Sequence, residues 1–300
     1  MCSEIMKIGD KKFDFKNKTY IMGIVDVTPD SFYKQSRYPI LENAVGRAIE
    51  IESEGADLID IGGESTKLGY TPISSSEEIS RVVQVIKAVK KETDLPISID
   101  TQKADVAKEA INAGADLVND VSGLKYDKEM AKVVADADVN ICICGLFPPF
   151  NGELIGMNGK DNAHIKEKRK SITHYSLMDA VIKDMKDRID IALNQDINQN
   201  KIIIDPGIGY TKSMEQNLEL ISKFNKINEL NYPLLFAISR KLFIGNLLDV
   251  PPEERLVGTI TLNMIGIFNN ASILRVHDVK EHAQMIKIVD EVYKFPHLKK

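Results

Sequence analysis

Side chains capable of chemistry follow almost every apolar run of this 300-residue sequence. Carboxylates, an amide, hydroxyls and cations occur there, and their positions are far apart along the chain. In chain order the members of interest are Asp26, Thr66, Lys67, Asp100, Asn119, Asp205, Tyr210, Ser239, Lys241, Arg275 and His277. If the runs are neighbouring strands of one sheet, these side chains converge in space and form one site.

Two chemical sets can be distinguished among them. Carboxylates accept paired N–H groups, an amide both donates and accepts, and an ammonium donates, which together suit a flat heterocycle with several N–H groups. That set is Asp100, Asn119, Asp205 and Lys241. Arg275 and His277, with Ser and Thr hydroxyls of the loops, suit a phosphate or diphosphate. The sequence therefore predicts a bicyclic heterocycle joined to an anionic leaving group.

Simpler roles compete for some of these residues. An Asp after a strand often caps the next helix, and we assign Asp120 and Asp278 to capping. Asp100 and Asp205 end apolar runs without an obvious capping pattern, so we expect them to contact a ligand. Lys241 follows another cation, which favours binding, although a Schiff-base role of the aldolase type stays open.

The elements that must position these residues follow one rhythm of apolar run, polar loop and amphipathic stretch. The apolar runs lie at 20–27, 58–61, 96–99, 115–118, 139–144, 201–204, 233–238 and 271–276, with helical patterns at stretches such as 41–54, 76–91, 104–113, 177–194 and 280–293. Continuous Ile, Val and Leu are typical of parallel strands buried on both faces. Eight such units predict an α/β fold, a closed (β/α)8 TIM barrel, whose active site lies at the carboxyl ends of its strands.

The whole chain is predicted to form a single domain. We expect residues 1–18 to form an N-terminal extension, with a possible short β-hairpin that closes the barrel floor, and residues 19–300 to form the barrel. The stretch 145–175 is polar and weakly periodic, which is typical of a functional loop. An open doubly wound sheet would place a glycine-rich turn after its first strand, whereas DVTPDSF stands there.

Composition narrows the class of protein. The net charge of −5 argues against a nucleic-acid-binding protein, and 43% hydrophobic residues are enough for a large core. Three cysteines cannot build a disulfide framework, and Cys142 and Cys144 read as structural thiols, one of them facing the barrel interior. Neither a signal peptide nor a membrane-spanning segment is visible. We therefore expect a cytoplasmic protein without a membrane partner.

Seven ordered motifs resemble those of the dihydropteroate synthases. They are MGIVDVTPDSFY (22–33), GADLIDIGGEST (55–66), ISIDT (97–101), AGADLVNDVSG (113–123), DPGIGY (205–210), SRKLFIG (239–245) and RVHDV (275–279). The resemblance implies the same eight-stranded barrel and a homodimer. It also implies a transferase of folate biosynthesis that condenses 6-hydroxymethyl-7,8-dihydropterin diphosphate with 4-aminobenzoate, releasing diphosphate, with Mg²⁺.

By this resemblance each set of residues receives a role. Asp100, Asn119, Asp205 and Lys241 would bind the pterin, and Asp26, Arg275 and His277 the diphosphate, with Asp26 at the metal. Thr66, Lys67, Tyr210 and Ser239 would border the aminobenzoate, where sulfonamides inhibit the family. The residues expected to act most directly in catalysis are Asp100, Lys241, Arg275 and His277.

The sequence departs from the family pattern at three places. Asp26 stands where the family usually has Asn, and a carboxylate beside a diphosphate is repulsive unless a metal lies between them. Lys67 and Leu68 replace an Arg-Pro pair, so a planar bidentate contact is lost. The fifth run, ICICGLFPPFNG, lacks the family's His. These differences predict altered sulfonamide sensitivity and mark the chain as a divergent member.

Three other functions fit part of the pattern. A pterin-binding paralogue with lost or altered catalysis fits the intact pterin set. A methyltetrahydrofolate-dependent corrinoid methyltransferase would share the barrel and the pterin pocket, but the TPDSF and SRK segments argue against it. A Schiff-base aldolase would use Lys241.

Overall fold

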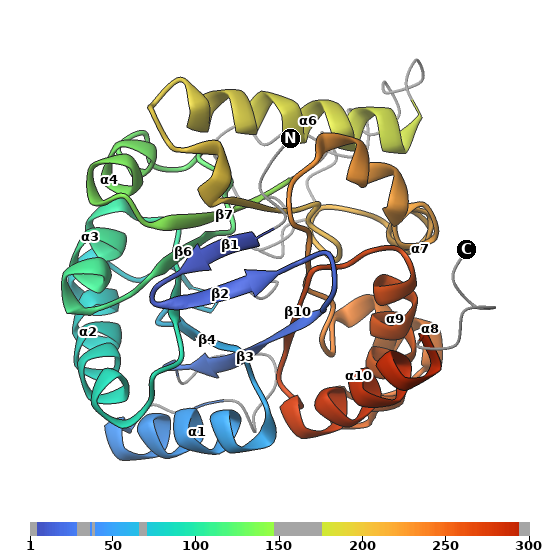
Figure 1. The fold of residues 1–300 in the computed structure, drawn as a ribbon, viewed down its shortest axis with the longest axis horizontal. Coiled ribbons are helices and arrows are strands. Elements are labelled where there is room, and N and C mark those ends of the chain that lie inside the picture. Colours follow the sequence, from blue (N-terminus) through green and yellow to red (C-terminus); the bar gives the residue numbers. More distant parts are fainter. Residues whose placement is uncertain (1–4, 29–36, 38–39, 66–70, 147–175, 294–300) are drawn as a thin grey trace.

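A parallel β-barrel ringed by helices forms the body of the protein (Figure 1). The computed structural model describes residues 5–28, 37, 40–65, 71–146 and 176–293. The barrel strands are β3 (Tyr20–Asp26), β4 (Leu58–Gly62), β5 (Ile97–Asp100), β6 (Leu117–Asp120), β7 (Asn140–Cys144), β8 (Ile202–Asp205), β9 (Leu235–Phe236) and β10 (Ile273–Val276). Their order in the sheet is β8-β7-β6-β5-β4-β3-β10-β9, which confirms the predicted eight parallel strands.

The sheet closes where its two edge strands, β8 and β9, meet. Ile204 forms an isolated parallel bridge with Leu234, and its backbone N–H donates to the carbonyl of Pro233 at 3.0 Å. Strand β9 is shorter than the predicted run because its ladder with β10 covers two residue pairs. The contact between β8 and β9 therefore turns an eight-stranded sheet into a barrel without exposed edges.

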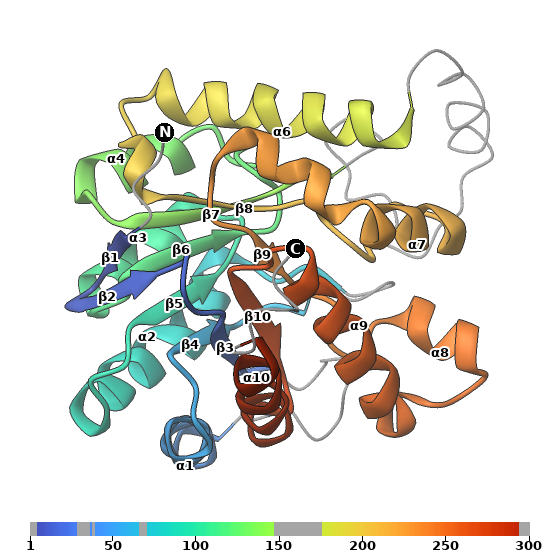
Figure 2. The ribbon, with the colours of Figure 1, turned by 45° about the vertical axis from the view of Figure 1, so that its right-hand side comes forward.

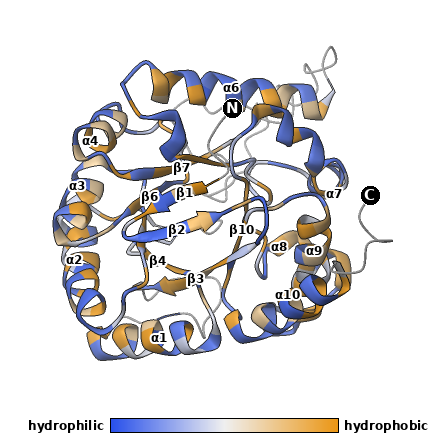
Figure 3. Cartoon of the chain, viewed as in Figure 1, coloured by the Kyte–Doolittle hydropathy of each residue, from blue (hydrophilic) through white to orange (hydrophobic). Residues whose placement is uncertain are grey.

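The helices cover the outside of the sheet (Figures 1 and 2). They are α1 (Leu41–Glu54), α2 (Ser75–Glu92), α3 (Ala104–Ala113), α4 (Met130–Ala137), α6 (Leu177–Leu193), α7 (Met214–Ser222), α8 (Leu242–Leu248), α9 (Leu256–Phe268) and α10 (Val279–Tyr293), with 3₁₀ segments at Gln199–Lys201, Phe224–Leu230 and Pro252–Glu254. The predicted helices are confirmed, with ends that differ by at most one residue. Most carry hydrophilic and hydrophobic segments on the same helix (Figure 3), as expected for a layer between core and water.

An antiparallel hairpin closes the end of the barrel at which the strands begin. Its strands are β1 (Ile5–Ile8) and β2 (Lys11–Asp14). Their buried side chains, Met6, Ile8 and Phe13, pack against residues near the strand starts that include Tyr20 and Leu58. In Figure 1 the hairpin lies across the middle of the ring of helices. The predicted N-terminal hairpin is confirmed, whereas a domain boundary at residue 18 stays a prediction.

Alternation along each strand decides which side chains enter the barrel. In β4, Ile59 and Ile61 pack outward in the core beneath the helices, whereas Leu58 belongs to the inner cluster next to the hairpin. Because side chains alternate with a period of two, Asp60 points inward above Leu58. The same argument directs Asp100, Asn119, Asp205 and Arg275 inward, since the residues before them belong to the outer core. The inside of the barrel is thus apolar at the hairpin end and polar at the opposite end.

No helix among the residues that the structure describes combines the length and apolarity needed to cross a membrane.

Candidate active site

Five inward-facing side chains from five strands meet near the carboxyl end of the barrel. Asp60 comes from β4, Asp100 from β5, Asn119 from β6, Asp205 from β8 and Arg275 from β10. The ladder places Gly62 opposite Asp100, and Asp100 opposite Asn119. The sequence predicted that four of these residues converge, and the structure confirms that they do. We call this end of the barrel the mouth.

Arg275 holds two of the mouth carboxylates. Its Nε donates to Oδ2 of Asp60 and its Nη2 to Oδ2 of Asp100, each at 2.6 Å, and the amide of Asn119 donates to Oδ2 of Asp60 at 3.3 Å. The second oxygens, Oδ1 of Asp60 and Oδ1 of Asp100, are buried without a hydrogen-bond partner. An unpaired buried acceptor is costly. Two such oxygens beside one arginine therefore indicate acceptors kept for the N–H groups of a ligand.

The charge balance at Arg275 shifts the protonation of its partners. Burial raises the pKa of Asp100 to about 8, with Asp60 and Asp26 adding repulsion and Arg275 opposing the shift. Burial disfavours the Arg275 cation, but Asp60 and Asp100 outweigh that effect and hold its pKa well above the usual value. The guanidinium stays charged, while the carboxyl of Asp100 titrates near neutral pH. A group that is so shifted and lies in a concave site is a candidate functional group.

Lys241 reaches the mouth from the start of α8. Its ammonium donates to the carbonyl of Ile208 and lies 3.9 Å from the centre of the Tyr210 ring, a cation–π contact. Gly209 makes room for the side chain, because a Cβ there would lie 2.4 Å from Cδ of Lys241, and its φ of +82° suits glycine. The DPGIGY segment thus orients Lys241 along the mouth.

Asp205 and a second lysine occupy the same segment. Oδ1 of Asp205 accepts the N–H of Gly207 at 2.8 Å, and Nζ of Lys212 donates to the Gly207 carbonyl at 2.8 Å. Gly207 has a φ of +70°, and a Cβ there would lie 1.8 Å from the carbonyl oxygen of Gly145. Any side chain at position 207 would therefore push apart the loops that follow β7 and β8.

Burial makes both lysines poor cations. It lowers the pKa of Lys241 to about 8, against the attraction of Asp205, and it lowers the pKa of Lys212 to about 8. Burial also raises the pKa of Asp205, while Lys241 opposes that rise. These opposed shifts show that Lys241 and Asp205 interact electrostatically in a poorly solvated place. They can serve as a donor and an acceptor for one bound ring.

His277 is neutral and held by Ser239. Its Nδ1 lies 2.8 Å from Oγ of Ser239, and its backbone N–H donates to the same oxygen at 3.2 Å. Burial, together with the charges of Arg275, Arg240 and Arg47, lowers the pKa of His277 well below the usual value. Ser239, predicted at the aminobenzoate, therefore also orients the imidazole that was predicted at the diphosphate.

Asp26 ends β3 at the edge of the mouth and is partly exposed. It interacts electrostatically with both Asp100 and Arg275. A Cβ at Gly62 would lie 3.8 Å from Oδ1 of Asp26 and 3.7 Å from Cβ of Asp100, so this glycine keeps the space between the two aspartates open. Within the described ranges, no three His, Cys, Asp or Glu side chains gather as a metal cage. Mg²⁺ is commonly held by one or two carboxylates together with substrate phosphates, so a single Asp26 fits such an ion.

A family model described as pterin binding enzyme matches residues 22–277. A dihydropteroate synthase of Clostridium beijerinckii is 44% identical over 286 residues, which cover 95% of this chain and 98% of that relative. The chain belongs to the dihydropteroate synthase family.

Solved dihydropteroate synthases share the fold. A Clostridium difficile enzyme, solved in the presence of pteroic acid, has a TM-score of 0.81 and 40% identity, over 94% of this chain and all of that chain. A Xanthomonas albilineans enzyme, solved with 4-aminobenzoic acid, has a TM-score of 0.84 and 31% identity, over 98% of this chain and all of that chain. The similarity spans the barrel and its mouth together.

Several predicted residues of this dihydropteroate synthase fall outside the described residues. They are Thr66, Lys67 and Leu68, together with most of the 145–175 stretch. Cys142 and Cys144 are buried in β7; Cys142 belongs to the inner cluster and Cys144 packs near Tyr210. Both therefore face inward, where the sequence predicted one, and burial raises the pKa of both thiols well above the usual value.

The two capping assignments have different outcomes. Asp120 accepts the backbone N–H groups of Ser122 and Leu124, at 2.8 and 2.7 Å, so it stabilises a turn rather than a helix start. Asp278 forms a two-fold ion pair with Arg240, at 2.8 and 2.7 Å. Arg240, next to Lys241, is thereby engaged in structure, which leaves Lys241 as the ligand-binding cation.

Sequence reasoning missed two residues of the mouth, Asp60 and Lys212. We searched for polar residues after each apolar run, whereas Asp60 lies inside the run 58–61 as its one charged residue. A fully buried carboxylate within a continuous apolar strand was the signal that could have revealed it. Lys212 follows the DPGIGY segment too closely to stand out from an ordinary loop lysine.

Proposed function

We propose that this chain is a dihydropteroate synthase that condenses 6-hydroxymethyl-7,8-dihydropterin diphosphate with 4-aminobenzoate. One observation carries the proposal: carboxylates, an amide and cations from strands far apart in sequence meet at one mouth and leave buried acceptors without partners. The solved relatives with pteroic acid and with 4-aminobenzoic acid support the same two substrates. The family membership favours this reaction over the methyltransferase and aldolase alternatives.

The pterin half of the substrate matches the unpaired acceptors. A pterin carries an exocyclic amine and a ring N–H on one edge, and a carboxylate accepts such a pair. Oδ1 of Asp100 is buried without a partner, and Asp205 has a second oxygen beyond the one that accepts from Gly207. Lys241 and Asn119 supply donors for the carbonyl and ring nitrogens. The pterin thus takes the place of water at groups that burial has already desolvated.

The diphosphate half fits the opposite side of the mouth. Arg275 supplies a permanent positive charge and His277 a neutral imidazole, both buried, so the leaving group meets donors that need little rearrangement. Asp26 would hold Mg²⁺ together with diphosphate oxygens, and the ion when bound would neutralise charge on the leaving group. We propose that this ion explains a carboxylate at position 26.

The reaction breaks one bond and forms another. The C–O bond between the pterin methylene carbon and the diphosphate breaks, and the electron pair leaves with the diphosphate. The amine nitrogen of 4-aminobenzoate attacks the same carbon and loses one proton. Positive charge that develops on the pterin is stabilised by nearby Asp100 and Asp205, and the buried mouth excludes water. Tyr210, Ser239, Thr66 and Lys67 are proposed to border the aminobenzoate.

Turnover by the purified chain tests this function. We expect diphosphate release that requires the pterin diphosphate, 4-aminobenzoate and Mg²⁺ together. Asp205→Asn is the matched control, because it keeps the shape and the Gly207 hydrogen bond while removing the charge. Binding of the pterin diphosphate without any turnover would contradict the proposal and favour a pterin-binding paralogue. Sulfonamide sensitivity, expected to be altered by Lys67 and Leu68, is measured in the same assay.

We further propose that the chain acts as a homodimer through α8 and α9. Helix α9 carries no charged residue, and the exposed fractions of Val257 and Phe268 are 74% and 49%. A helix that is apolar all round is normally covered, and the family resemblance points to a second copy. Val257→Glu is expected to give a monomer in sedimentation experiments; an unchanged mass or a monomeric parent would contradict the dimer. Two unpaired thiols, Cys142 and Cys144, support a reducing cytoplasm.

A further inference from the structure

A buried ammonium lies beside the mouth but outside the pterin set. Lys103, in the short connection between β5 and α3, donates from Nζ to Oε1 of Glu64 at 2.9 Å, to the carbonyl of Ile73 at 2.8 Å and to Oε2 of Glu78 at 2.7 Å. An ammonium has three N–H donors, so all of them are used. Lys103 is thus fully committed to three points of the neighbouring connection and helix.

This cluster is well buried for an ion pair. The exposed fractions of the Lys103, Glu64 and Glu78 side chains are 8%, 5% and 1%. Burial raises the pKa of Glu78, whereas the two glutamates outweigh burial and raise the pKa of Lys103. Because buried ion pairs add little net stability over apolar packing, their use here indicates a geometric requirement.

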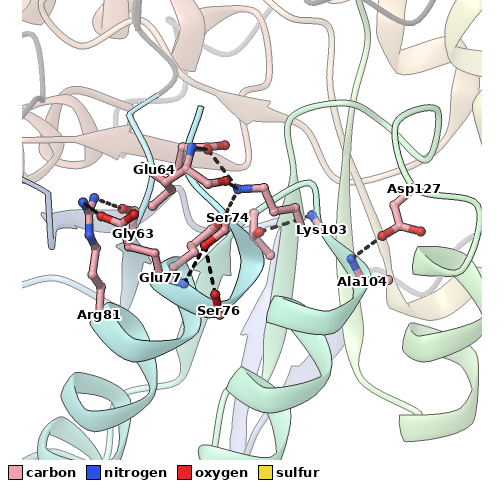
Figure 4. Close-up of polar contacts among 12 residues, drawn as sticks. Gly63, Glu64, Ser74, Ser76, Glu77, Arg81, Lys103, Ala104 and Asp127 are labelled. Carbon is pink, nitrogen blue, oxygen red and sulfur yellow. Dashed lines mark hydrogen bonds and ion pairs between the residues drawn. The ribbon is translucent and has the colours of Figure 1, made fainter. Parts of the chain in front are cut away.

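That requirement concerns the β4–α2 connection, whose two described ends the cluster joins. Oε1 of Glu64, at the first end, also accepts the N–H of Ile73 at 2.8 Å, so Glu64 and Lys103 together bind both backbone groups of Ile73. The next residue, Ser74, caps α2 by accepting the N–H of Glu77. Figure 4 shows Lys103 pointing toward Glu64 across the start of α2.

The first end is fixed by a second contact. Nη1 of Arg81, on α2, donates to the carbonyl of Gly63 at 2.9 Å. A Cβ at Gly63 would lie 2.6 Å from Cγ1 of Val82, so this backbone lies directly on the helix. Asp127 caps α3 at Ala104 in place of Lys103, which leaves the Lys103 side chain available for the connection.

The cluster therefore links two parts of the substrate site. Lys103 follows Asp100, the proposed pterin carboxylate, by three residues, and Glu64 precedes Thr66, a proposed aminobenzoate neighbour, by two. We propose that Lys103 and Glu64 are positioning residues that fix the β4–α2 connection relative to the pterin-binding end of β5, and so set the affinity for 4-aminobenzoate. This inference rests on the proposed function.

The test separates the two substrates by steady-state kinetics and calorimetry on the full chain. Glu64→Asp keeps the charge but withdraws the carboxylate by one methylene, and Glu64→Ala removes it while leaving the Lys103–Glu78 pair. We expect each to raise the KM for 4-aminobenzoate, by about tenfold for Glu64→Ala, because small displacements of positioning groups weaken productive binding. The Kd of the pterin diphosphate should change less than about twofold, since its contacts lie elsewhere. Glu64→Gln, whose side-chain oxygen can accept from both donors, should restore most of the affinity.

Lys90→Met is the matched control, because Lys90 pairs with Asp116 at 2.6 Å at the opposite end of the barrel. It should lower the melting temperature without changing either constant. An unchanged KM for 4-aminobenzoate in both Glu64→Asp and Glu64→Ala, or equal weakening of both substrates, would overturn the inference. A parent protein without turnover would instead refute the proposed function, so the two failures are distinguishable.

Discussion

The two ends of the barrel hold their aspartates in opposite ways. At the hairpin end, Asp57 accepts from Lys18 at 2.6 Å and from the N–H of Ile21 at 2.8 Å, and Asp116 accepts from Lys90 at 2.6 Å and from the N–H of Ile97 at 2.9 Å. At the mouth, Asp60 and Asp100 share Arg275, and each leaves one buried oxygen without a partner.

The difference separates aspartates that build the barrel from aspartates that bind a ligand. At the hairpin end each carboxylate has a lysine of its own and also satisfies a strand N–H group that lies next to the barrel's apolar floor. At the mouth one cation serves two carboxylates, which keeps negative charge and empty lone pairs in a desolvated place. Removing a charge from the hairpin end should therefore cost stability, and removing one from the mouth should cost function.

The largest contrast is expected between two lysine substitutions. Lys241→Met removes a buried donor to the pterin and should lower kcat/KM roughly 10²- to 10³-fold, or about 3–4 kcal/mol of transition-state stabilisation. Lys90→Met breaks a partly exposed pair and should cost about 0–1 kcal/mol of unfolding free energy with kcat/KM unchanged. Steady-state kinetics and urea unfolding of both variants decide the matter. Equal kinetic losses in the two variants would abolish the distinction between the ends.

The pH dependence should identify the mouth lysine. Burial lowers the pKa of Lys241 to about 8, so the cation is lost as the pH rises through 8 and kcat/KM should fall there about tenfold per pH unit. Lys241→Arg retains its charge throughout this range and should lose that alkaline limb, at a reduced maximal rate. The difference between the two profiles isolates the enzyme group from the titration of the substrates. Identical alkaline limbs would show that Lys241 does not control the decline.

A smaller effect is expected in the pH dependence of stability. Because burial raises the pKa of Asp100 from 3.8 to about 8, the folded state retains a proton that the unfolded chain releases. Its contribution to the unfolding free energy is present below pH 3.8 and is lost as the pH rises through 8. Asp100→Asn should therefore show a weaker decline in melting temperature between pH 5 and about pH 8.5. Parallel declines in the two proteins would contradict the assignment.

Much of the barrel could be predicted because buried parallel strands are continuous apolar runs. The run 233–238 shows the limit of that signal, since the regular strand is Leu235–Phe236. An apolar stretch reveals burial, but not where the ladder with the next strand ends. Ala237 and Ile238 stay buried after β9 ends, and burial is all that their hydrophobicity indicates.

The site was partly predictable for a related reason. Asp100, Asn119 and Asp205 could be found because they end their strands, and parallel strands end at one mouth. Asp60 lies one turn of the side-chain alternation deeper, and Lys103 acts through the backbone of Ile73. Contacts of this kind depend on side-chain direction and on distant chain segments, which spacing along the sequence does not encode.

A crystal structure with a dihydropterin and 4-aminobenzoate bound would test the central claim most directly. Our account predicts the pterin ring inside the mouth, with its N–H edge on Oδ1 of Asp100 and on Asp205, and with Lys241 donating to it. A pterin bound at any other place on the chain, or one in the mouth with Asp100 and Asp205 both turned away, would contradict it.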